Sequence, residues 1–248
     1  MDTIKVENIE QKTLSDIVTQ DFRAASVFEK HSLDFCCHGN MSLIDAVNEK
    51  QISAETMLAD LEKAFQSNDT TMMDFNTMEL DTLVEYIIQT HHSFVREKLP
   101  FITELGNKVI NAHGENHPEV KKIAELFSTV NTEFEGHLVK EEMILFPHIK
   151  ILAEVKRGEV KYVAPPFGSI ANPIRVMEAE HENAGAAFDS IKQLANGYDT
   201  PADACNTFRV YYAELENFEN DLHKHVHLEN NILFPKSLIF EKENQQIK

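Results

Sequence analysis

The chain has 248 residues, of which 42% are hydrophobic and 26% charged, so it can bury a hydrophobic core in one or two domains. Its 41 acidic and 23 basic residues give a formal net charge of −18, which disfavours nucleic acids and acidic membranes as partners. Only 8 Gly and 8 Pro leave few turn-forming residues for an all-β fold. The composition therefore predicts an all-α protein.

The first residues and the cysteines indicate the cellular compartment of the protein. The first residues, MDTIKVENIEQK, lack the apolar core of a signal peptide, and no later run approaches the roughly 20 apolar residues of a membrane span. The three cysteines, Cys36, Cys37 and Cys205, cannot form a disulfide framework. We therefore expect a cytoplasmic protein with reduced thiols and no membrane partner.

The first part of the chain predicts a small helical domain. Short amphipathic stretches run from about residue 14 to 65 and are interrupted by the polar segment 31–42. Residues 66–76 contain SNDTT, have turn-forming composition and show little periodicity, which is typical of a linker. We expect a helical Cys-Cys domain over residues 1–73 and a second domain over residues 74–248.

Four long helical patterns follow the linker. The first begins near Thr77, where apolar residues recur at helical spacing. The other three are expected to begin with Pro in the first helical position, at Pro118, Pro173 and Pro201. The segment 153–170, with two Gly and two Pro, separates two helical hairpins. The simplest arrangement is an antiparallel four-helix bundle.

The two hairpins repeat one motif. Residues 137–147 read HLVKEEMILFP and residues 225–235 read HVHLENNILFP, so His, the Glu four residues later and ILFP recur at an offset of 88. His92 and His181, each on the preceding helix, are 89 residues apart. A duplicated hairpin, in which each half supplies one single His and one His-x-x-x-Glu pair, explains this pattern.

This spacing predicts a metal centre. Residues four apart lie one turn apart on the same face of a helix, so each pair presents an imidazole beside a carboxylate. Two pairs and two single histidines then converge on the bundle interior as a dinuclear centre bridged by the two glutamates. Mixed imidazole and carboxylate ligands suit iron or manganese better than structural zinc, and we expect iron. The six expected ligands are His92, His137, Glu141, His181, His225 and Glu229.

Ordinary explanations exist for each part of the pattern. A single His on a helix is usually a surface residue or a core residue with its own partner, and one His/Glu pair at this spacing often occurs by chance. The recurrence of both pairs in one duplicated frame favours the metal site. The repeated ILFP indicates core packing and a Pro that ends or kinks the helix. We interpret His91, His223 and His227 as non-ligands, because each should face away from its neighbouring ligand.

These motifs resemble a known family. The paired His-x-x-x-Glu segments with ILFP, VMEAEHENAG around His181 and DFCCHG near the N-terminus are similar to the Repair of Iron Centres family, the hemerythrin-like di-iron proteins that restore iron–sulfur clusters. The resemblance covers nearly the whole chain. It implies a Cys-Cys domain followed by an antiparallel four-helix hemerythrin-like bundle. It also implies an oxo- and carboxylate-bridged site with two non-haem Fe ions, held by the same six residues, and homodimers that act on damaged iron–sulfur proteins.

The first ligand depends on register. Relatives commonly carry a second His three residues after the first ligand, whereas the residue three positions after His92 is Val95. The R-E-x-L-P motif that comes next, at residues 96–100, favours His92 over His91.

Other residues near these motifs have two interpretations. Cys36 and Cys37 are either exposed, partly ionised thiols with an iron-transfer or redox role, which the resemblance favours, or thiols that only pack. His38 would lower the pKa of such a thiol, and Cys205 is expected to be buried in a helix. Glu142 and Glu180, beside two expected ligands, either assist ligand exchange or proton movement or belong to a solvated surface.

Three functions remain in competition. The leading hypothesis is donation of labile iron to clusters damaged by oxidative or nitrosative stress, more than classical enzymatic turnover. The first alternative is a nitric oxide reductase that uses open positions on the two metal ions. The second is a di-iron module that binds nitric oxide or dioxygen, although hemerythrin sites are richer in His and less symmetric. Ferritin-like oxidases carry Glu-x-x-His, which is the reverse order with a different spacing.

Overall fold

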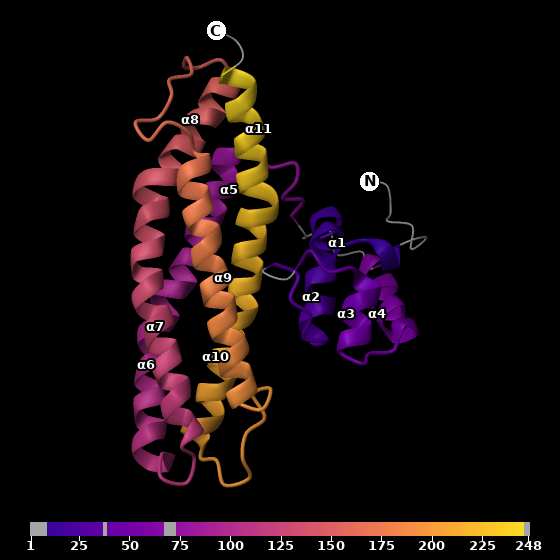
Figure 1. Cartoon of the computed structure of the whole chain (residues 1–248), viewed down its shortest axis with the longest axis vertical. Helices are drawn as coiled ribbons and strands as arrows, with labels where there is room; N and C mark the ends of the chain where they lie inside the picture. Colours follow the sequence, from indigo (N-terminus) through magenta and orange to yellow (C-terminus); the bar gives the residue numbers. More distant parts are fainter. Residues whose placement is uncertain (1–8, 37–38, 67–72, 246–248) are drawn as a thin grey trace. The chain divides into compact units, whose positions relative to one another are not determined.

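The computed structural model describes residues 9–36, 39–66 and 73–245, and the regular structure in these ranges is helical (Figure 1). The same ranges contain no β-strand, and one isolated antiparallel bridge joins Thr13 to Ser42. Across these described residues, no helix combines the length and the apolar character needed to cross a bilayer. The predicted all-α class is confirmed.

The chain forms two compact units. Residues 1–79 and 223–236 make up the first unit, and residues 80–222 and 237–248 make up the second. The last helical pattern therefore contributes residues to both. The division into domains at residues 73 and 74 stays a prediction.

Short capped helices make up the N-terminal part of the first unit, as expected. The side chain of Thr13 accepts a hydrogen bond from the N–H of Asp16, and Ser42 does the same for Asp45. Such caps satisfy N–H groups that the first turn of a helix leaves over. The apolar faces share one core around the fully buried Phe28. The helices are η1 (Ile9–Gln11), α1 (Leu14–Gln20), α2 (Arg23–Lys30), α3 (Leu43–Glu49) and α4 (Ala54–Gln66).

Four long helical runs form the predicted antiparallel bundle, and Figure 1 shows α6, α7 and α9 side by side. Because most of these runs change their hydrogen-bonding pattern along the way, several consist of more than one element. The runs are α5 (Leu80–Ile87), η2 (Ile88–His92) and α6 (Ser93–His113); α7 (Glu119–Lys140), η3 (Glu141–Leu145) and α8 (Phe146–Lys156); α9 (Ala171–Leu194); and α10 (Asn206–His227), η4 (Leu228–Leu233) and α11 (Phe234–Gln245).

One phenylalanine contacts a ring from each of the three other runs of the second unit. Phe218 on α10 stacks on Phe188 of α9, with ring centroids 5.5 Å apart and an interplanar angle of 13°. It meets Phe127 of α7 edge to face at 5.7 Å and lies 6.1 Å from the ring of Phe94 of α6. Only 1% of Phe218 is exposed. Aromatic contacts at these distances add to the gain from burial, so Phe218 joins the four runs.

The helix starts agree only in part with the prediction from prolines. Pro118 directly precedes α7, and Pro173 lies in the first turn of α9. The prediction for Pro201 is wrong, because α10 begins at Asn206. The N–H of Ala204 instead donates to the carbonyl of Pro201 at 3.0 Å, so this Pro begins a turn. The turn therefore ends before the helix begins.

Within residues 73–245, which the structure describes, three π-helices interrupt the long runs: η2, η3 and η4. In η3 the N–H of Phe146 donates to the carbonyl of Glu141, five residues back, and in η4 the N–H of Phe234 donates to Glu229 in the same way. We expected the Pro of each ILFP motif to end or kink its helix. Neither Pro ends it, because α8 and α11 continue beyond the Pro. Short π segments often occur at functional sites.

Residues 223–236 of the fourth run pack within the first unit. The ring of His227 lies 5.9 Å from Phe22 and 5.6 Å from Phe35. Lys224 pairs with Glu29 at 3.0 Å, and Lys236 donates to backbone carbonyls of residues 75, 76 and 78. Aromatic packing and charged contacts therefore both join this segment to the N-terminal helices.

Candidate metal centre

Three helical runs of the second unit bring histidines to one buried carboxylate. Nε2 of His92, at the end of η2, and Nε2 of His137, near the end of α7, each lie 3.3 Å from Oε2 of Glu141, which opens η3. Nε2 of His181 on α9 lies 3.1 Å from Nε2 of His137. None of these four side chains is more than 2% exposed. Their donor atoms are therefore shielded from bulk water.

The fourth run carries the other His/Glu pair. Nε2 of His225, near the end of α10, lies 3.1 Å from Oε1 of Glu229 in η4. Both side chains are fully buried. The His-x-x-x-Glu spacing thus places imidazole and carboxylate together in both copies of the repeat, as the helical geometry predicts.

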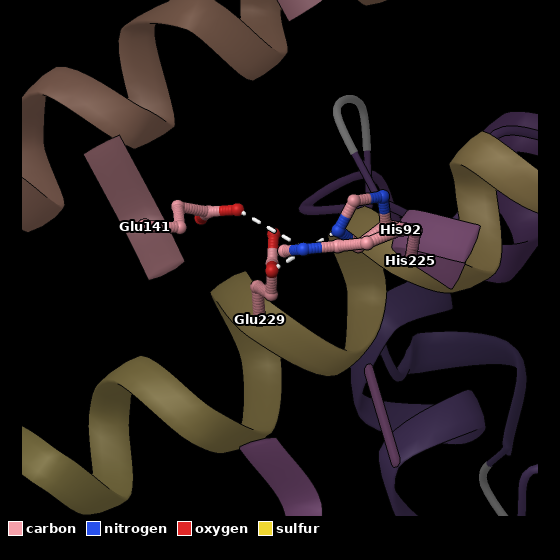
Figure 2. Close-up of side chains that lie close together, drawn as sticks. All are labelled: His92, Glu141, His225 and Glu229. Atoms are coloured by element: carbon pink, nitrogen blue, oxygen red, sulfur yellow. Dashed lines mark hydrogen bonds and ion pairs between the residues drawn. The ribbon is translucent and has the colours of Figure 1, made fainter. Parts of the chain in front are cut away.

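The structure groups these six residues into two sets of four, in each of which the possible ligand atoms lie within 4.8 Å of one another. One set contains two histidines from the first and fourth runs, drawn in Figure 2 with the two glutamates. The other contains two histidines from the second and third runs. Both glutamates belong to both sets. The sets are His92, Glu141, His225, Glu229 and His137, Glu141, His181, Glu229.

The donor chemistry fits a cation. Two fully buried carboxylates carry a large desolvation cost unless positive charge or hydrogen-bond donors face them. Neutral imidazole nitrogens and carboxylate oxygens are common ligands of transition metals. The buried His/Glu group therefore has the donor atoms and the burial that a metal site needs.

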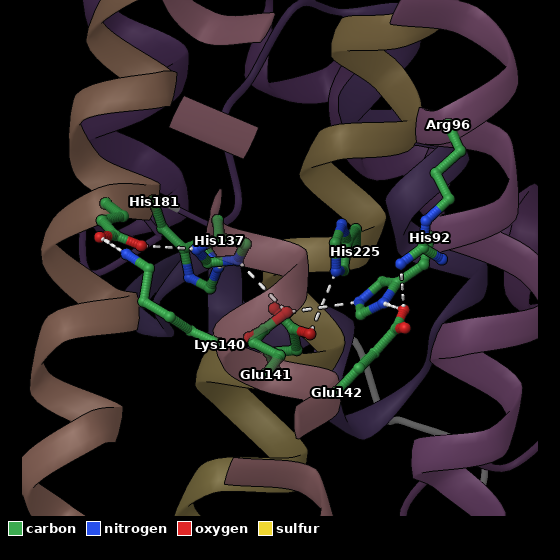
Figure 3. Close-up of polar contacts among 10 residues, drawn as sticks. His92, Arg96, His137, Lys140, Glu141, Glu142, His181 and His225 are labelled. Carbon is green, nitrogen blue, oxygen red and sulfur yellow. Dashed lines mark hydrogen bonds and ion pairs between the residues drawn. The ribbon is translucent and has the colours of Figure 1, made fainter. Parts of the chain in front are cut away.

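Two more carboxylates orient the histidines from outside. Nδ1 of His92 donates to Oε1 of Glu142 at 2.7 Å (Figure 3). Nδ1 of His137 donates to Oε2 of Glu180 at 3.0 Å. A carboxylate on the far ring nitrogen holds the proton there, so the lone pair of Nε2 faces the centre and its basicity rises. Of the two interpretations of Glu142 and Glu180, the contacts favour assistance to the ligands over a solvated surface.

Basic side chains in turn hold these carboxylates. Arg96 donates to Glu142 at 2.8 Å, and Lys140 donates to Glu180. Partial burial raises the pKa of Glu142, but the hydrogen bonds from His92 and Arg96 outweigh it, so the pKa is lowered. Partial burial also raises the pKa of Glu180, but the hydrogen bonds from Lys140 and His137 outweigh it, so this pKa is lowered as well. Both groups are therefore ionised at neutral pH and accept hydrogen bonds from the histidines.

Replacing Glu142 or Glu180 with Gln is expected to weaken metal binding by about 10- to 100-fold, because a neutral amide holds the imidazole proton less firmly. Competition with a chelator of known affinity measures the change. Glu178→Gln is the matched control, because this exposed residue lies on α9 two positions before Glu180. Equal affinities for all four proteins would show that the outer carboxylates do not tune the site.

The remaining candidate residues lie elsewhere. His91 belongs to neither set, and its Nδ1 lies 3.0 Å from Asp221. Cys36 is only 8% exposed, so the expectation of an exposed thiol is wrong for this residue. Cys205 is exposed just before α10 and is not buried in a helix as expected. Predictions for Cys37 and His38 lie outside the described residues.

Sequence comparisons are consistent with this geometry. The family profile described as the hemerythrin HHE cation binding domain matches residues 83–237, and a domain of unknown function, DUF542, matches residues 10–65. The chain is 38% identical over 217 residues to "Iron-sulfur cluster repair protein YtfE" of Yersinia pestis (strain Pestoides F). The aligned region covers 87% of this chain and 91% of that protein.

The protein of the same name from Yersinia pseudotuberculosis serotype O:1b (strain IP 31758) is 37% identical over an equal length. The match to the cation-binding domain spans both His-x-x-x-Glu pairs and both single histidines. The chain therefore belongs to the hemerythrin HHE cation-binding family and, within it, to the Repair of Iron Centres proteins.

Proposed function

We propose that this chain repairs iron–sulfur clusters damaged by oxidative or nitrosative stress, and that it does so by supplying labile iron. The iron would come from a carboxylate-bridged di-iron centre held by the six residues of the two donor sets. The sharing of Glu141 and Glu229 between the sets carries the proposal, because a carboxylate has two oxygens and can bind two cations at once. The names of the similar Yersinia proteins supply the cluster-repair activity.

The number of protein ligands in each set favours iron that can leave the site. Each set offers two imidazoles and two shared carboxylates, whereas iron commonly takes up to six ligands. Positions therefore remain for an oxo bridge, water or an incoming ligand. Such an ion can be passed on without breaking every protein bond first.

Other parts of the proposal concern setting and partners. We expect the protein to work in the cytoplasm as a homodimer, with damaged iron–sulfur proteins as its clients. Within the chain, residues 1–73 would supply thiol chemistry through Cys36 and Cys37, and residues 74–248 would hold the iron. Nitric oxide and dioxygen are small molecules that open iron positions would bind.

The nitric oxide alternative predicts a different outcome. A nitric oxide reductase would form nitrous oxide over many cycles when given a reductant. The named relatives favour repair over this activity and over reversible dioxygen binding. A single nitrosylation without further turnover is the result that we expect.

A transfer assay tests the repair function. The protein, loaded anaerobically with isotopically labelled ferrous iron, is incubated with a hydro-lyase whose [4Fe–4S] cluster has lost iron by oxidation. We expect the activity of the hydro-lyase to return and the label to appear in its cluster. An equal amount of free ferrous iron, and the same protein with Glu141→Ala and Glu229→Ala, are the controls. Recovery that is no faster than with free iron would contradict the proposal.

A further inference from the structure

A second group of potential metal ligands lies in the first unit, and none of its members belongs to the bundle centre. Asp34, Cys36 and His223 each offer one ligand atom, and these atoms lie within 4.8 Å of one another. Sγ of Cys36 lies 3.1 Å from Oδ1 of Asp34. The group therefore combines a carboxylate, a thiol and an imidazole, the three side-chain types that bind transition metals most often.

The local fold holds the three residues in place. The backbone N–H of Cys36 donates to Oδ1 of Asp34 at 2.8 Å, which fixes the carboxylate beside the thiol. Phe35, between them, is fully buried, and its ring lies 6.0 Å from that of His223. The aromatic contact thus anchors the loop after α2 on the residue of α10 that completes the group.

Burial gives the group the character of a site and not of a surface cluster. Cys36 is 8% exposed, while Asp34 and His223 are half-buried, so an ion from solvent can reach the group past these two. In a tetrahedral site with a sulfur ligand at about 2.3 Å and a nitrogen ligand at about 2.0 Å, the two donor atoms are about 3.5 Å apart. Small side-chain movements bring the group to that spacing.

We propose that Asp34, Cys36 and His223 form a separate mononuclear site for a divalent transition metal such as Fe²⁺ or Zn²⁺. Binding replaces the proton of the Cys36 thiol by a sulfur–metal bond, and the proton passes to solvent, so no electron is transferred. Three protein ligands leave a fourth position of a tetrahedral ion for water or a donor from a client. We expected His223 not to be a ligand of the bundle centre, and the proposal agrees with this. A role for His223 in a second site was not expected.

The site deepens the thiol role proposed above, but its test does not depend on iron repair. Cobalt(II) bound to a thiolate gives an intense sulfur-to-metal absorption in the near ultraviolet, which nitrogen and oxygen ligands do not give. All six residues of the bundle centre are His or Glu, so this absorption reports on the cysteine site alone. The full-length protein is titrated anaerobically with cobalt(II) chloride. We expect the absorption to saturate at about one cobalt per chain, after allowance for cobalt taken by the bundle.

Substitutions assign the ligands. Cys36→Ser should abolish the absorption, and Cys205→Ser, which removes an exposed thiol, should leave it unchanged. Asp34→Asn keeps an oxygen that accepts the Cys36 N–H but removes the charge, so it separates the ligand from the structural role of Asp34. This variant and His223→Ala should each weaken cobalt binding by about tenfold or more. Far-ultraviolet circular dichroism checks that the variants remain helical.

Several outcomes would overturn the proposal. Wild-type protein without the absorption has no thiolate site. An absorption that survives in Cys36→Ser, or disappears in Cys205→Ser, belongs to another cysteine. Unchanged affinity in both Asp34→Asn and His223→Ala would leave Cys36 as a thiol without the other two ligands. In the protein with Glu141→Ala and Glu229→Ala the absorption should persist, which separates failure of this proposal from failure of the di-iron centre.

Discussion

Replacing Glu141 and Glu229 together with Ala is expected to remove the metal of the bundle. Wild-type protein purified anaerobically should contain about two iron ions per chain, and the double variant close to none. Each glutamate belongs to both donor sets, so the change removes two of the four donors from each set. Elemental analysis for iron, manganese and zinc measures the result.

The fold should survive this change. Both carboxylates are fully buried, and their desolvation opposes folding when no cation is bound. The variant should therefore keep its helical circular dichroism. Glu133→Ala with Glu216→Ala is the matched control, because it removes one exposed glutamate from each of α7 and α10. Wild-type protein without metal, or zinc that both double variants retain, would contradict the assignment.

Phe218→Ala should cost about 3–5 kcal/mol of unfolding free energy. The substitution leaves a cavity among rings from the other three runs of the bundle, and a rigid helical frame can close such a cavity only in part. Denaturant unfolding with the metal chelated measures the effect without a contribution from ligand binding.

The control for this prediction is Phe101→Ala on α6, where the ring is 40% exposed. The same atoms are removed there, but much of the ring already contacts water, so the loss should be far smaller. If both substitutions cost the same, the cluster around Phe218 would not be the feature that joins the helices.

Much of the fold and of the site was predictable because a repeat carries more information than a single motif. The helical spacing and the duplicated His-x-x-x-Glu pairs predicted the bundle and the six residues that the structure groups into two sets. Their role as ligands stays a prediction. The neighbours Glu142 and Glu180 remained undecided, because adjacency in sequence does not tell whether a side chain turns toward a His on another helix.

Other features depend on information that side-chain spacing does not contain. A helical pattern of apolar residues does not distinguish an α-helix, whose N–H groups bond to the fourth residue back, from a π-helix, whose N–H groups bond to the fifth. The pattern therefore predicted neither η3 nor η4. Cys36 lies close to His223, which comes nearly 190 residues later in the chain, and local spacing does not reveal such a neighbour. The start of α10 was misplaced because a turn over residues 201–204 lies between Pro201 and the helix.

The two outer carboxylates also bear on how quickly an ion can leave. The side chains of Glu142 and Glu180 are 24% and 28% exposed, whereas those of His92 and His137 behind them are at most 2% exposed. At His92 and at His137, one partly exposed carboxylate therefore lies between the buried imidazole and bulk water. Rotation of one glutamate with its Arg or Lys partner would give water access to the donors without unfolding a helix. The same two glutamates therefore bear on equilibrium affinity, through the imidazole protons that they hold, and on exchange rate, through the access of water to the donors.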